Sequence, residues 1–223
     1  MDFGLLLAWV LLFFWRKDVR KEMLFVSIPM GVISPFLEWL YIIDWWKPLY
    51  LTGTPVGLED FIFGFTIGGI SAVVYEEVFK KKIKERKFSD TKKRLKSFEF
   101  WIAAVLSVIL FYLAYFLLHW NTFWATSVLL LTAIIYMLIK RPDLTIDSLV
   151  SGIMMVVVSA IVYSLVQLIT PGWIDSFWHF KIFPRIIIFS LPIEDIIFYL
   201  LFGMVLGPLY EFWQEERLVN MKK

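Results

Sequence analysis

The sequence contains no cysteine and only two histidines, His119 and His179. The absence of cysteine excludes a disulfide scaffold, a thiolate metal site and a cysteine nucleophile. Two histidines cannot form a His-rich metal centre. Charged residues make up only 19% of the 223 residues, whereas a soluble domain has about 25%. An ordinary globular composition is therefore excluded as well.

Hydrophobic residues, in contrast, make up 60% of the chain, and the mean hydropathy is +0.73. A helix needs roughly 20 apolar residues to cross the hydrocarbon layer of a membrane. Reading for apolar runs bounded by charge predicts an all-α integral membrane protein with seven transmembrane helices. These spans cover residues 2–15, 22–43, 55–78, 98–118, 122–139, 146–169 and 184–210.

The lysine and arginine residues are distributed unevenly between the two sides of this layout. With seven spans, 19 of the 22 fall on one side, and only Lys47, Lys181 and Arg185 fall on the other. The positive-inside rule then places the N-terminus outside the cell membrane and the C-terminus in the cytoplasm. The basic run from Lys80 to Lys96 is read as an ordinary cytoplasmic loop rather than a lipid or nucleic-acid patch, and no nucleic-acid partner is expected.

Two stretches of the chain repeat one another. The stretch PVGLEDFIFGFTIGGISAVVYEE begins at Pro55, and LPIEDIIFYLLFGMVLGPLYEF begins at Leu191. At a constant offset of 135, Glu59, Asp60, Phe63, Gly68, Tyr75 and Glu76 align with Glu194, Asp195, Phe198, Gly203, Tyr210 and Glu211. We expect two parallel three-helix repeats joined by a linking helix. The domain bounds are 1–79 for the first repeat, 80–121 for the basic loop and linking helix, and 122–223 for the second repeat with its tail.

Small residues recur every fourth position in the third and seventh spans, at Gly64, Gly68 and Ala72 and at Gly203 and Gly207. In lipid, such rows let two helix backbones approach closely. This pattern predicts close helix packing. It also raises the expectation that the two spans meet at the pseudo-axis and bring the acidic pairs together.

Two acidic pairs, Glu59-Asp60 and Glu194-Asp195, are predicted a third to a half of the way across their spans. A carboxylate there costs about 2.5–3.5 kcal/mol on the insertion scale, so intramembrane acids are functional candidates. Burial favours the neutral form, and a neutral carboxylic acid in a dry pocket can serve as a general acid. The competing interpretation is hydrogen bonding to polar groups on neighbouring helices, namely Ser27, Ser34, Ser159 or Gln167.

Further candidates surround the acids. Glu38 either positions a substrate or lies at the outer headgroup boundary. Aromatic residues follow both acidic pairs; they either stabilise a cation or pack against lipid and neighbouring helices. Those taken as substrate-binding candidates are Phe63, Phe198, Tyr199 and Phe202.

Charged residues at the cytoplasmic span ends are read as a ring of interfacial ion pairs rather than guards of a site entrance. They are Arg16, Asp18, Glu76, Glu77, Arg141, Asp143 and Glu211. No phosphate-binding loop, dinucleotide fingerprint, metal-ligand spacing or nucleophile elbow occurs, so neither a metal nor a cofactor is expected.

The pattern Pro-x-Glu-Asp followed by aromatics in LPIEDIIFYLLFG, together with RPDL before an apolar span and PGW after it, resembles the lycopene cyclase domain family. The resemblance covers nearly the whole chain and is similar to the fused form of that family, with two three-helix halves. The family motif maps onto Pro192, Glu194 and Asp195 in the second half. In the first half it maps onto Pro55, Glu59 and Asp60, with two extra residues between the proline and the acid.

The resemblance implies a cofactor-free cyclase acting on lycopene or a related carotenoid. A carboxylic acid would protonate the terminal double bond, a six-membered ring would close through a carbocation, and a base would remove a proton. Glu194 and Glu59 are then the acid candidates, and Asp195 and Asp60 are their partners or bases. The expected partners are the polyene substrate and membrane lipid, and a homo-oligomer is compatible with the sequence.

Two alternatives remain at this stage. The first is a non-enzymatic carrier of a lipid or small solute, with an intramembrane carboxylate proton relay. The second is a related isoprenoid hydratase or isomerase, in which water or another group captures the same cation.

Overall fold

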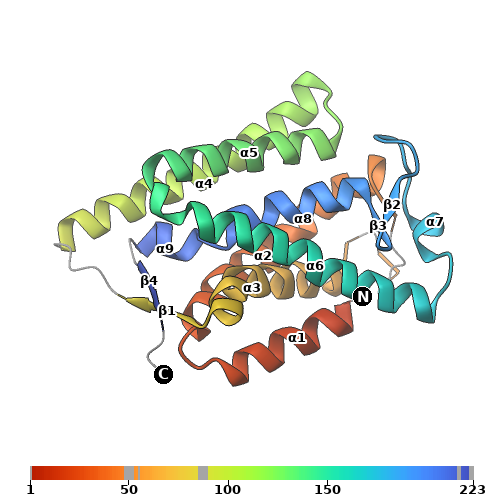
Figure 1. Ribbon diagram of the computed structural model, residues 1–223. Helices are drawn as coiled ribbons and strands as arrows, with labels where there is room; N and C mark the ends of the chain where they lie inside the picture. Colours follow the sequence, from red (N-terminus) through yellow and green to blue (C-terminus); the bar gives the residue numbers. More distant parts are fainter. Residues whose placement is uncertain (1, 48–52, 55, 85–89, 215–216, 221–223) are drawn as a thin grey trace.

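The computed structural model describes residues 2–47, 53–54, 56–84, 90–214 and 217–220. Pro55 of the first motif and residues 85–89 of the basic run lie outside the described residues. The chain is all-α apart from two short β-pairs, and its long helices lie side by side (Figure 1). The helices are α1 (Asp2–Trp15), α2 (Arg20–Asp44), α3 (Leu58–Phe79), α4 (Asp90–Leu118), α5 (Thr122–Lys140), α6 (Thr145–Ile169), α7 (Trp173–Phe177), α8 (Ile193–Leu206) and α9 (Leu209–Gln214), with a 3-10 turn η1 (Pro142–Leu144).

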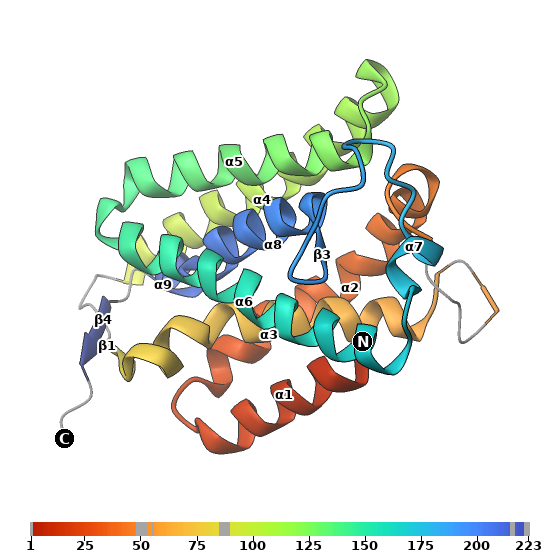
Figure 2. The ribbon, with the colours of Figure 1, turned by 45° about the vertical axis from the view of Figure 1, so that its right-hand side comes forward.

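The bundle has two ends, each marked by a two-stranded antiparallel β-pair. At one end, here called the hairpin end, β2 (Ile187–Ile188) pairs with β3 (Leu191–Pro192) near α7. At the other end, called the α9 end, β1 (Lys81–Lys84) pairs with β4 (Arg217–Asn220) close to α9 (Figures 1 and 2). Strands separated by most of the chain therefore meet at the α9 end.

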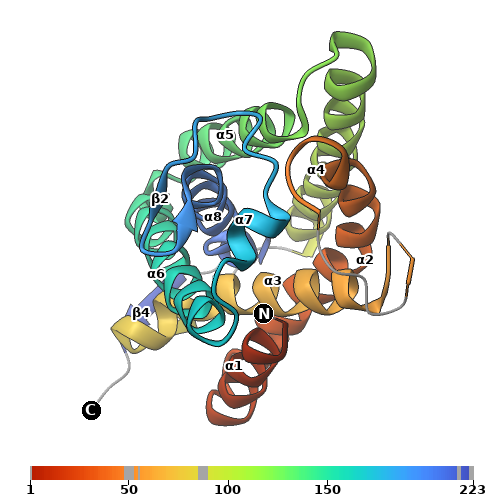
Figure 3. The ribbon, with the colours of Figure 1, turned by 90° about the vertical axis from the view of Figure 1, so that its right-hand side faces the viewer.

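Helices α1–α3 form the first half of the molecule, and α5–α9 form the second. In the first half α3 packs against α1 and α2, and in the second α8 packs against α5 and α6. Helix α3 also contacts α6 and α8, which joins the halves along the centre of the bundle (Figure 3). The buried apolar core contains residues of both halves, so the described parts of the two halves share one interior.

Among the described residues, five helical segments are long and apolar enough to cross a membrane: Arg20–Asp44, Leu58–Phe79, Thr122–Lys140, Pro142–Ile169 and Ile193–Gln214. Two further apolar helices, Asp2–Trp15 and Ile102–Leu118, are shorter. Large apolar side chains such as Leu7, Leu131 and Ile161 are exposed on the outside, as a helix surface in contact with lipid requires. The chain is a multi-pass membrane protein.

The last predicted span begins later than expected. Residues 184–192 were assigned to a helix, but β2 and β3 form a tight hairpin there, and α8 begins only at Ile193. Phe189 and Ser190 both have positive φ, at 50° and 61°, which is the backbone of a two-residue hairpin turn whose twist matches the strands. The apolar run Ile186–Ile188 resembles a helix in composition, so hydropathy alone could not locate this boundary.

The rows of small residues pack each helix against its own half. A Cβ on Gly64 would lie 2.4 Å from the Ser34 Cβ of α2. A Cβ on Gly203 would lie 2.7 Å from the Ser151 carbonyl oxygen of α6. Close packing is confirmed, and the two helices do contact each other as expected, but the glycine rows themselves face α2 and α6.

Tryptophans near the predicted span ends, among them Trp15, Trp45, Trp124, Trp173 and Trp178, are predicted to form an aromatic belt at the membrane surface. The structure confirms exposure for only some of them. Trp15 and Trp124 are exposed, as a belt requires. Trp45, Trp173 and Trp178 are buried, and the last two pack edge to face at 5.1 Å. Proximity to a span end cannot distinguish a lipid-facing indole from one that fills the interior.

Candidate functional site

A cavity of about 200 Å³ lies between α2, α3, α4, α5, α6 and α8. Its wall is almost entirely apolar and aromatic, but two carboxyl groups reach it, those of Glu38 and Asp195. Both residues are buried, with exposures of 5% each. A mostly apolar pocket with a few convergent polar groups is the usual form of a small-molecule site.

Asp195 is held by aromatic hydrogen-bond donors. The Tyr163 hydroxyl donates to Oδ2 at 2.8 Å, and the Trp178 indole N–H donates to Oδ1 at 3.3 Å. The Tyr199 hydroxyl lies 3.2 Å from that of Tyr163. Because Tyr163 has a single proton and gives it to Asp195, Tyr199 is the donor in that second bond. Each of these bonds favours a charged, fixed carboxylate at Asp195.

Glu38 has different surroundings on α2. Its Oε1 has no hydrogen-bond partner in the described part of the chain, although it is buried. The Trp46 indole is a hydrogen-bond partner of the Glu38 carboxyl group, and the Asp60 carboxyl interacts with Glu38 electrostatically. An unpartnered oxygen beside an apolar cavity is suited to carry a proton, because the neutral acid is the form that such an environment tolerates. Glu38 therefore lies in the interior of the bundle, on the cavity wall.

All five predicted substrate-binding residues line this cavity: Glu38, Phe63, Phe198, Tyr199 and Phe202. Phe198 and Phe202 lie 5.2 Å apart between ring centroids, and the Trp45 ring meets Phe198 edge to face at 5.4 Å. Aromatic faces around a desolvated centre stabilise a cation by about 0.5–2 kcal/mol each.

The four predicted catalytic acids lie in two places. Asp195 lines the cavity, whereas Glu59, Asp60 and Glu194 are buried but are not part of its wall. Helices α3 and α8 begin at Leu58 and Ile193, so each pair occupies the first turn of its helix and not the middle of a span. At that position free backbone N–H groups and the helix dipole stabilise carboxylates.

The three other acids interact with neighbouring backbone groups or with another carboxyl group. Asp60 Oδ2 accepts a hydrogen bond from the Gly57 N–H at 2.7 Å, which caps α3. Glu194 is buried near its own backbone N–H and that of Phe183 in the preceding loop, and its Oε2 has no hydrogen-bond partner among the described residues. Asp2, at the start of α1, acts on Glu59 electrostatically.

Basic side chains at the hairpin end are engaged elsewhere. Arg185 donates to both carboxylate oxygens of the exposed Asp175, with the Nη2–Oδ2 pair at 2.8 Å. This ion pair lowers the pKa of Asp175. Lys181 donates to the Ile43 carbonyl at 3.1 Å. None of these three residues is among those that line the cavity.

At the α9 end each half carries an arginine clamp, defined as an arginine that binds an aspartate two residues on and a distant glutamate carbonyl. Arg16 binds both oxygens of Asp18 at 2.9 Å and the Glu76 carbonyl at 3.1 Å. Arg141 binds both oxygens of Asp143 at 2.8 and 2.9 Å and the Glu211 carbonyl at 3.1 Å. The predicted interfacial ion pairs are confirmed for these arginines.

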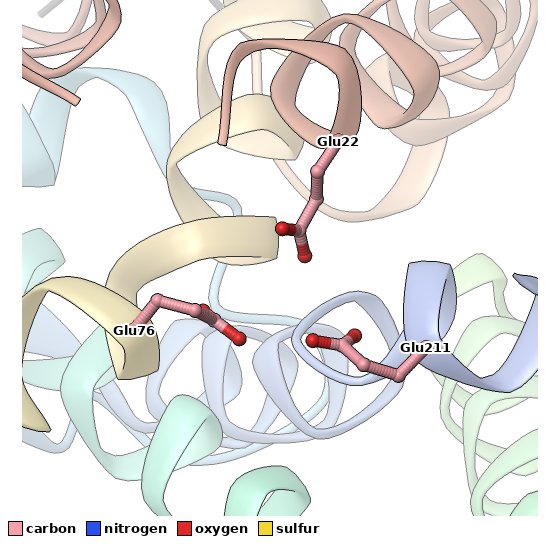
Figure 4. Close-up of side chains that lie close together, drawn as sticks. All are labelled: Glu22, Glu76 and Glu211. Carbon is pink, nitrogen blue, oxygen red and sulfur yellow. The ribbon is translucent and has the colours of Figure 1, made fainter. Parts of the chain in front are cut away.

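The carboxyl groups of Glu76 and Glu211 do not belong to that ring of ion pairs. Both side chains are fully buried, and with Glu22 of α2 they turn toward a common point (Figure 4). One oxygen of each lies within 4.8 Å of the others. Sequence reasoning missed this cluster because its members come from three separate helices and leave no ligand spacing along the chain.

Tyr163 and Trp178 were also missed as site residues. Tyr163 stands at the position in α6 that corresponds to Glu38 in α2, and Trp178 was assigned to the aromatic belt. Their hydrogen bonds to Asp195 depend on how α6, the α7 loop and α8 meet. The only sequence signal was the absence of an acid at the α6 counterpart of Glu38.

The fold and the site define a helical membrane protein with a carboxyl-bearing apolar cavity. A family model described as lycopene cyclase matches residues 1–78 and 120–213. The chain therefore belongs to the lycopene cyclase family, as the sequence motifs indicated. Neither the curated proteins nor the solved structures that were compared with the chain gave a match. Family membership implies an enzyme of carotenoid cyclisation with a hydrophobic substrate.

Proposed function

We propose that this chain closes the linear end group of lycopene or a related carotenoid into a β-ionone-type ring by acid catalysis without a cofactor. One observation carries the proposal: Glu38 and Asp195 reach the same apolar cavity in contrasting hydrogen-bond environments. Pairs of carboxyls whose environments differ in this way divide the roles of acid and base. The reaction is an isomerisation, so its atoms and electrons balance with no oxidant or reductant.

Glu38 is the proton donor in this proposal, and Asp195 is the base. Protonation of the terminal double bond leaves a tertiary carbocation, and the neighbouring double bond attacks it to form the six-membered ring. Asp195 then removes a proton from the ring cation to leave the new double bond. The hydrogen bonds from Tyr163 and Trp178 favour the charged form of Asp195 and orient it, and the carboxylate would also stabilise the cation electrostatically.

The aromatic wall shields the cation from water. Phe63, Phe198, Tyr199 and Phe202 surround the place where the charge develops. A cavity of about 200 Å³ is smaller than the roughly 300–1,000 Å³ of sites that enclose drug-sized ligands. It therefore suits the end group of a polyene, and the rest of the chain would extend beyond it.

In this proposal the other three acids do not react with the substrate but hold parts of the site in place. The Glu194 carboxyl lies near the Phe183 backbone, and in this role it would keep that loop beside the start of α8 and so orient Asp195, the next residue. Asp60 caps α3 and lies close enough to Glu38 to influence it. Glu59 lies beside Asp60 in the same first turn.

The proposal is tested by expressing the full chain in a bacterium that accumulates lycopene and separating the extracted pigments by chromatography. Wild type should yield mono- or bicyclic carotenes. Asp195→Asn should reduce ring closure at least 100-fold, as loss of a general base does. Glu194→Gln should retain more activity than Asp195→Asn. If Glu194→Gln alone abolishes cyclisation in a folded protein, Glu194 is the acid, as the sequence first suggested.

Other outcomes would separate the alternatives. Unchanged lycopene with wild-type protein folded in the membrane would contradict the cyclase proposal, and proton-dependent solute uptake in vesicles would then support a carrier. Hydroxylated acyclic products would indicate a hydratase, in which water captures the same cation.

The proposal also covers the membrane topology of the chain. We place seven crossings in the membrane as two parallel repeats, 1–79 and 122–223, joined by 80–121. The matching arginine clamps support the repeats, and the family match, which omits residues 79–119, supports the same division. The many lysines and arginines at the α9 end support a cytoplasmic location for that end, with the N-terminus outside.

A further inference from the structure

The cluster of Glu22, Glu76 and Glu211 lies at the end of the bundle opposite the cavity. In α2, Glu22 and Glu38 are separated by about 24 Å of helix at 1.5 Å per residue. The three side chains come from α2, α3 and α9 and converge (Figure 4). A fourth buried carboxyl, Asp147 of α6, acts electrostatically on both Glu76 and Glu211.

Glu76 and Glu211 are 0% exposed, and within the described residues neither oxygen of either carboxyl has a hydrogen-bond partner. The nearby arginines do not supply one, because Arg16 and Arg141 bind the backbone carbonyls of these glutamates. Two charged carboxyls that point at each other in a dry interior repel one another, and either a shared proton or a cation between them removes the repulsion. This geometry points to a bound cation.

We propose that a hard divalent cation of the Mg²⁺, Ca²⁺ and Mn²⁺ class binds between Glu22, Glu76 and Glu211. All the candidate ligands are carboxylate oxygens, which these ions prefer over nitrogen and sulfur. Ca²⁺–oxygen distances of about 2.3–2.6 Å place two opposite ligands roughly 4.6–5.2 Å apart. The separation of up to 4.8 Å between the oxygens is compatible with that span.

Such an ion joins the two halves of the molecule. Glu22 and Glu76 belong to the first half and Glu211 to the second. The cation would tie α2, α3 and α9 together beside the two arginine clamps and stabilise the α9 end. The site takes no part in the cyclisation and does not depend on the proposed function.

The test uses the purified full-length protein in detergent, stripped with a chelator and titrated with Mn²⁺ under electron paramagnetic resonance. We expect one saturable Mn²⁺ per chain, displaced by Ca²⁺ or Mg²⁺. At an ion concentration 100-fold above Kd, the thermal midpoint should rise by roughly 5–10 °C. No carotenoid is present, so the result is separate from that of the cyclase assay.

Glu76→Gln and Glu211→Gln should each weaken Mn²⁺ binding at least tenfold. The exposed Glu99 provides the matched control, since Glu99→Gln makes the same chemical change outside the cluster and should bind as wild type does. If one cluster variant fails to fold, Glu22→Gln tests the same site. Absence of saturable binding in wild type, with stability that rises on acidification, would overturn the proposal in favour of protons shared among the carboxyls.

Discussion

The two halves of the molecule are alike at the α9 end and different at the hairpin end. At the α9 end, Arg16 and Arg141 make the same three hydrogen bonds to an aspartate and a glutamate carbonyl, with distances that agree within 0.1 Å. Both clamps attach the end of the first helix of a half, α1 or α5, to its last helix, α3 or α9. The agreement shows that one local solution holds each three-helix unit together.

At the hairpin end the corresponding residues have diverged. Asp195 accepts hydrogen bonds from Tyr163 and Trp178 beside the cavity, whereas Asp60 accepts one from the Gly57 backbone and caps its helix. Glu38 stands where the second half has Tyr163. Each half thus contributes a different carboxyl to the cavity, and under the proposed function the two halves share one asymmetric site.

The largest expected effect is a difference in cyclisation activity between variants of Asp195 and of its counterpart Asp60. We expect Asp195→Asn to reduce cyclisation at least 100-fold. Asp60→Asn should reduce it less than tenfold and lower the free energy of unfolding by about 0.3–1 kcal/mol, because the amide oxygen still accepts the Gly57 hydrogen bond but the charge at the start of α3 is lost. Pigment analysis and thermal unfolding in detergent measure the two effects. Equal losses of activity would mean that both halves carry out the chemistry, which would remove the asymmetry.

The next comparison is between Glu38 and Tyr163, which stand at corresponding positions of α2 and α6. Glu38→Gln removes the proposed proton donor and should reduce product formation about 100-fold or more. Tyr163→Phe removes one hydrogen bond to a charged group, worth about 1.5–3 kcal/mol, and should reduce it roughly 10- to 100-fold. Initial rates of product formation in membranes measure both. A Glu38→Gln variant with full activity would move the acid role to another residue.

Stability, rather than activity, should report on the arginine clamps. Arg16→Ala and Arg141→Ala should each lower the free energy of unfolding by about 2–4 kcal/mol, because each removes several charge-assisted hydrogen bonds from a buried position. The two losses should agree within about 1 kcal/mol in thermal unfolding. A large loss from one variant and none from the other would show that the clamps are alike only in geometry.

The smallest effect concerns the paired glycines Gly68 and Gly203. A Cβ on Gly203 would meet backbone atoms of Ser151 and Gly152 within 2.8 Å, whereas one on Gly68 would meet the flexible Met30 side chain at 2.9 Å. Overpacking costs about 1–3 kcal/mol. Gly203→Ala should therefore lie at the upper end of that range and Gly68→Ala at the lower end. Similar thermal midpoints for the two variants would contradict this difference in packing.

Much of the fold could be predicted from the sequence. The apolar runs located the main helices, since a membrane helix must be long and apolar whatever it contacts. The boundary of the last helix was wrong because Ile186–Ile188 are apolar in a hairpin as in a helix, and only the positive φ values of Phe189 and Ser190 distinguish the two. The buried tryptophans were assigned to the surface for a similar reason.

The candidate site was predicted in part. Glu38 and the four aromatic candidates line the cavity with Asp195, because acids and aromatics inside apolar runs have few other places to lie. Tyr163 and Trp178 were missed, since a phenol and an indole carry no signal until their partner is known. The acidic cluster at the α9 end was missed because its residues are distant in the chain.

The sequence by itself determined the membrane character, the approximate helices, the internal similarity and the family motif, since each depends on composition and on residues close together in the chain. The tertiary structure decided which of the buried acids share a cavity, which cap a helix and which converge at the α9 end. Those outcomes depend on the rotation and depth of each helix against its neighbours. Glu194 and Asp195 are neighbours in the chain, yet only Asp195 lines the cavity.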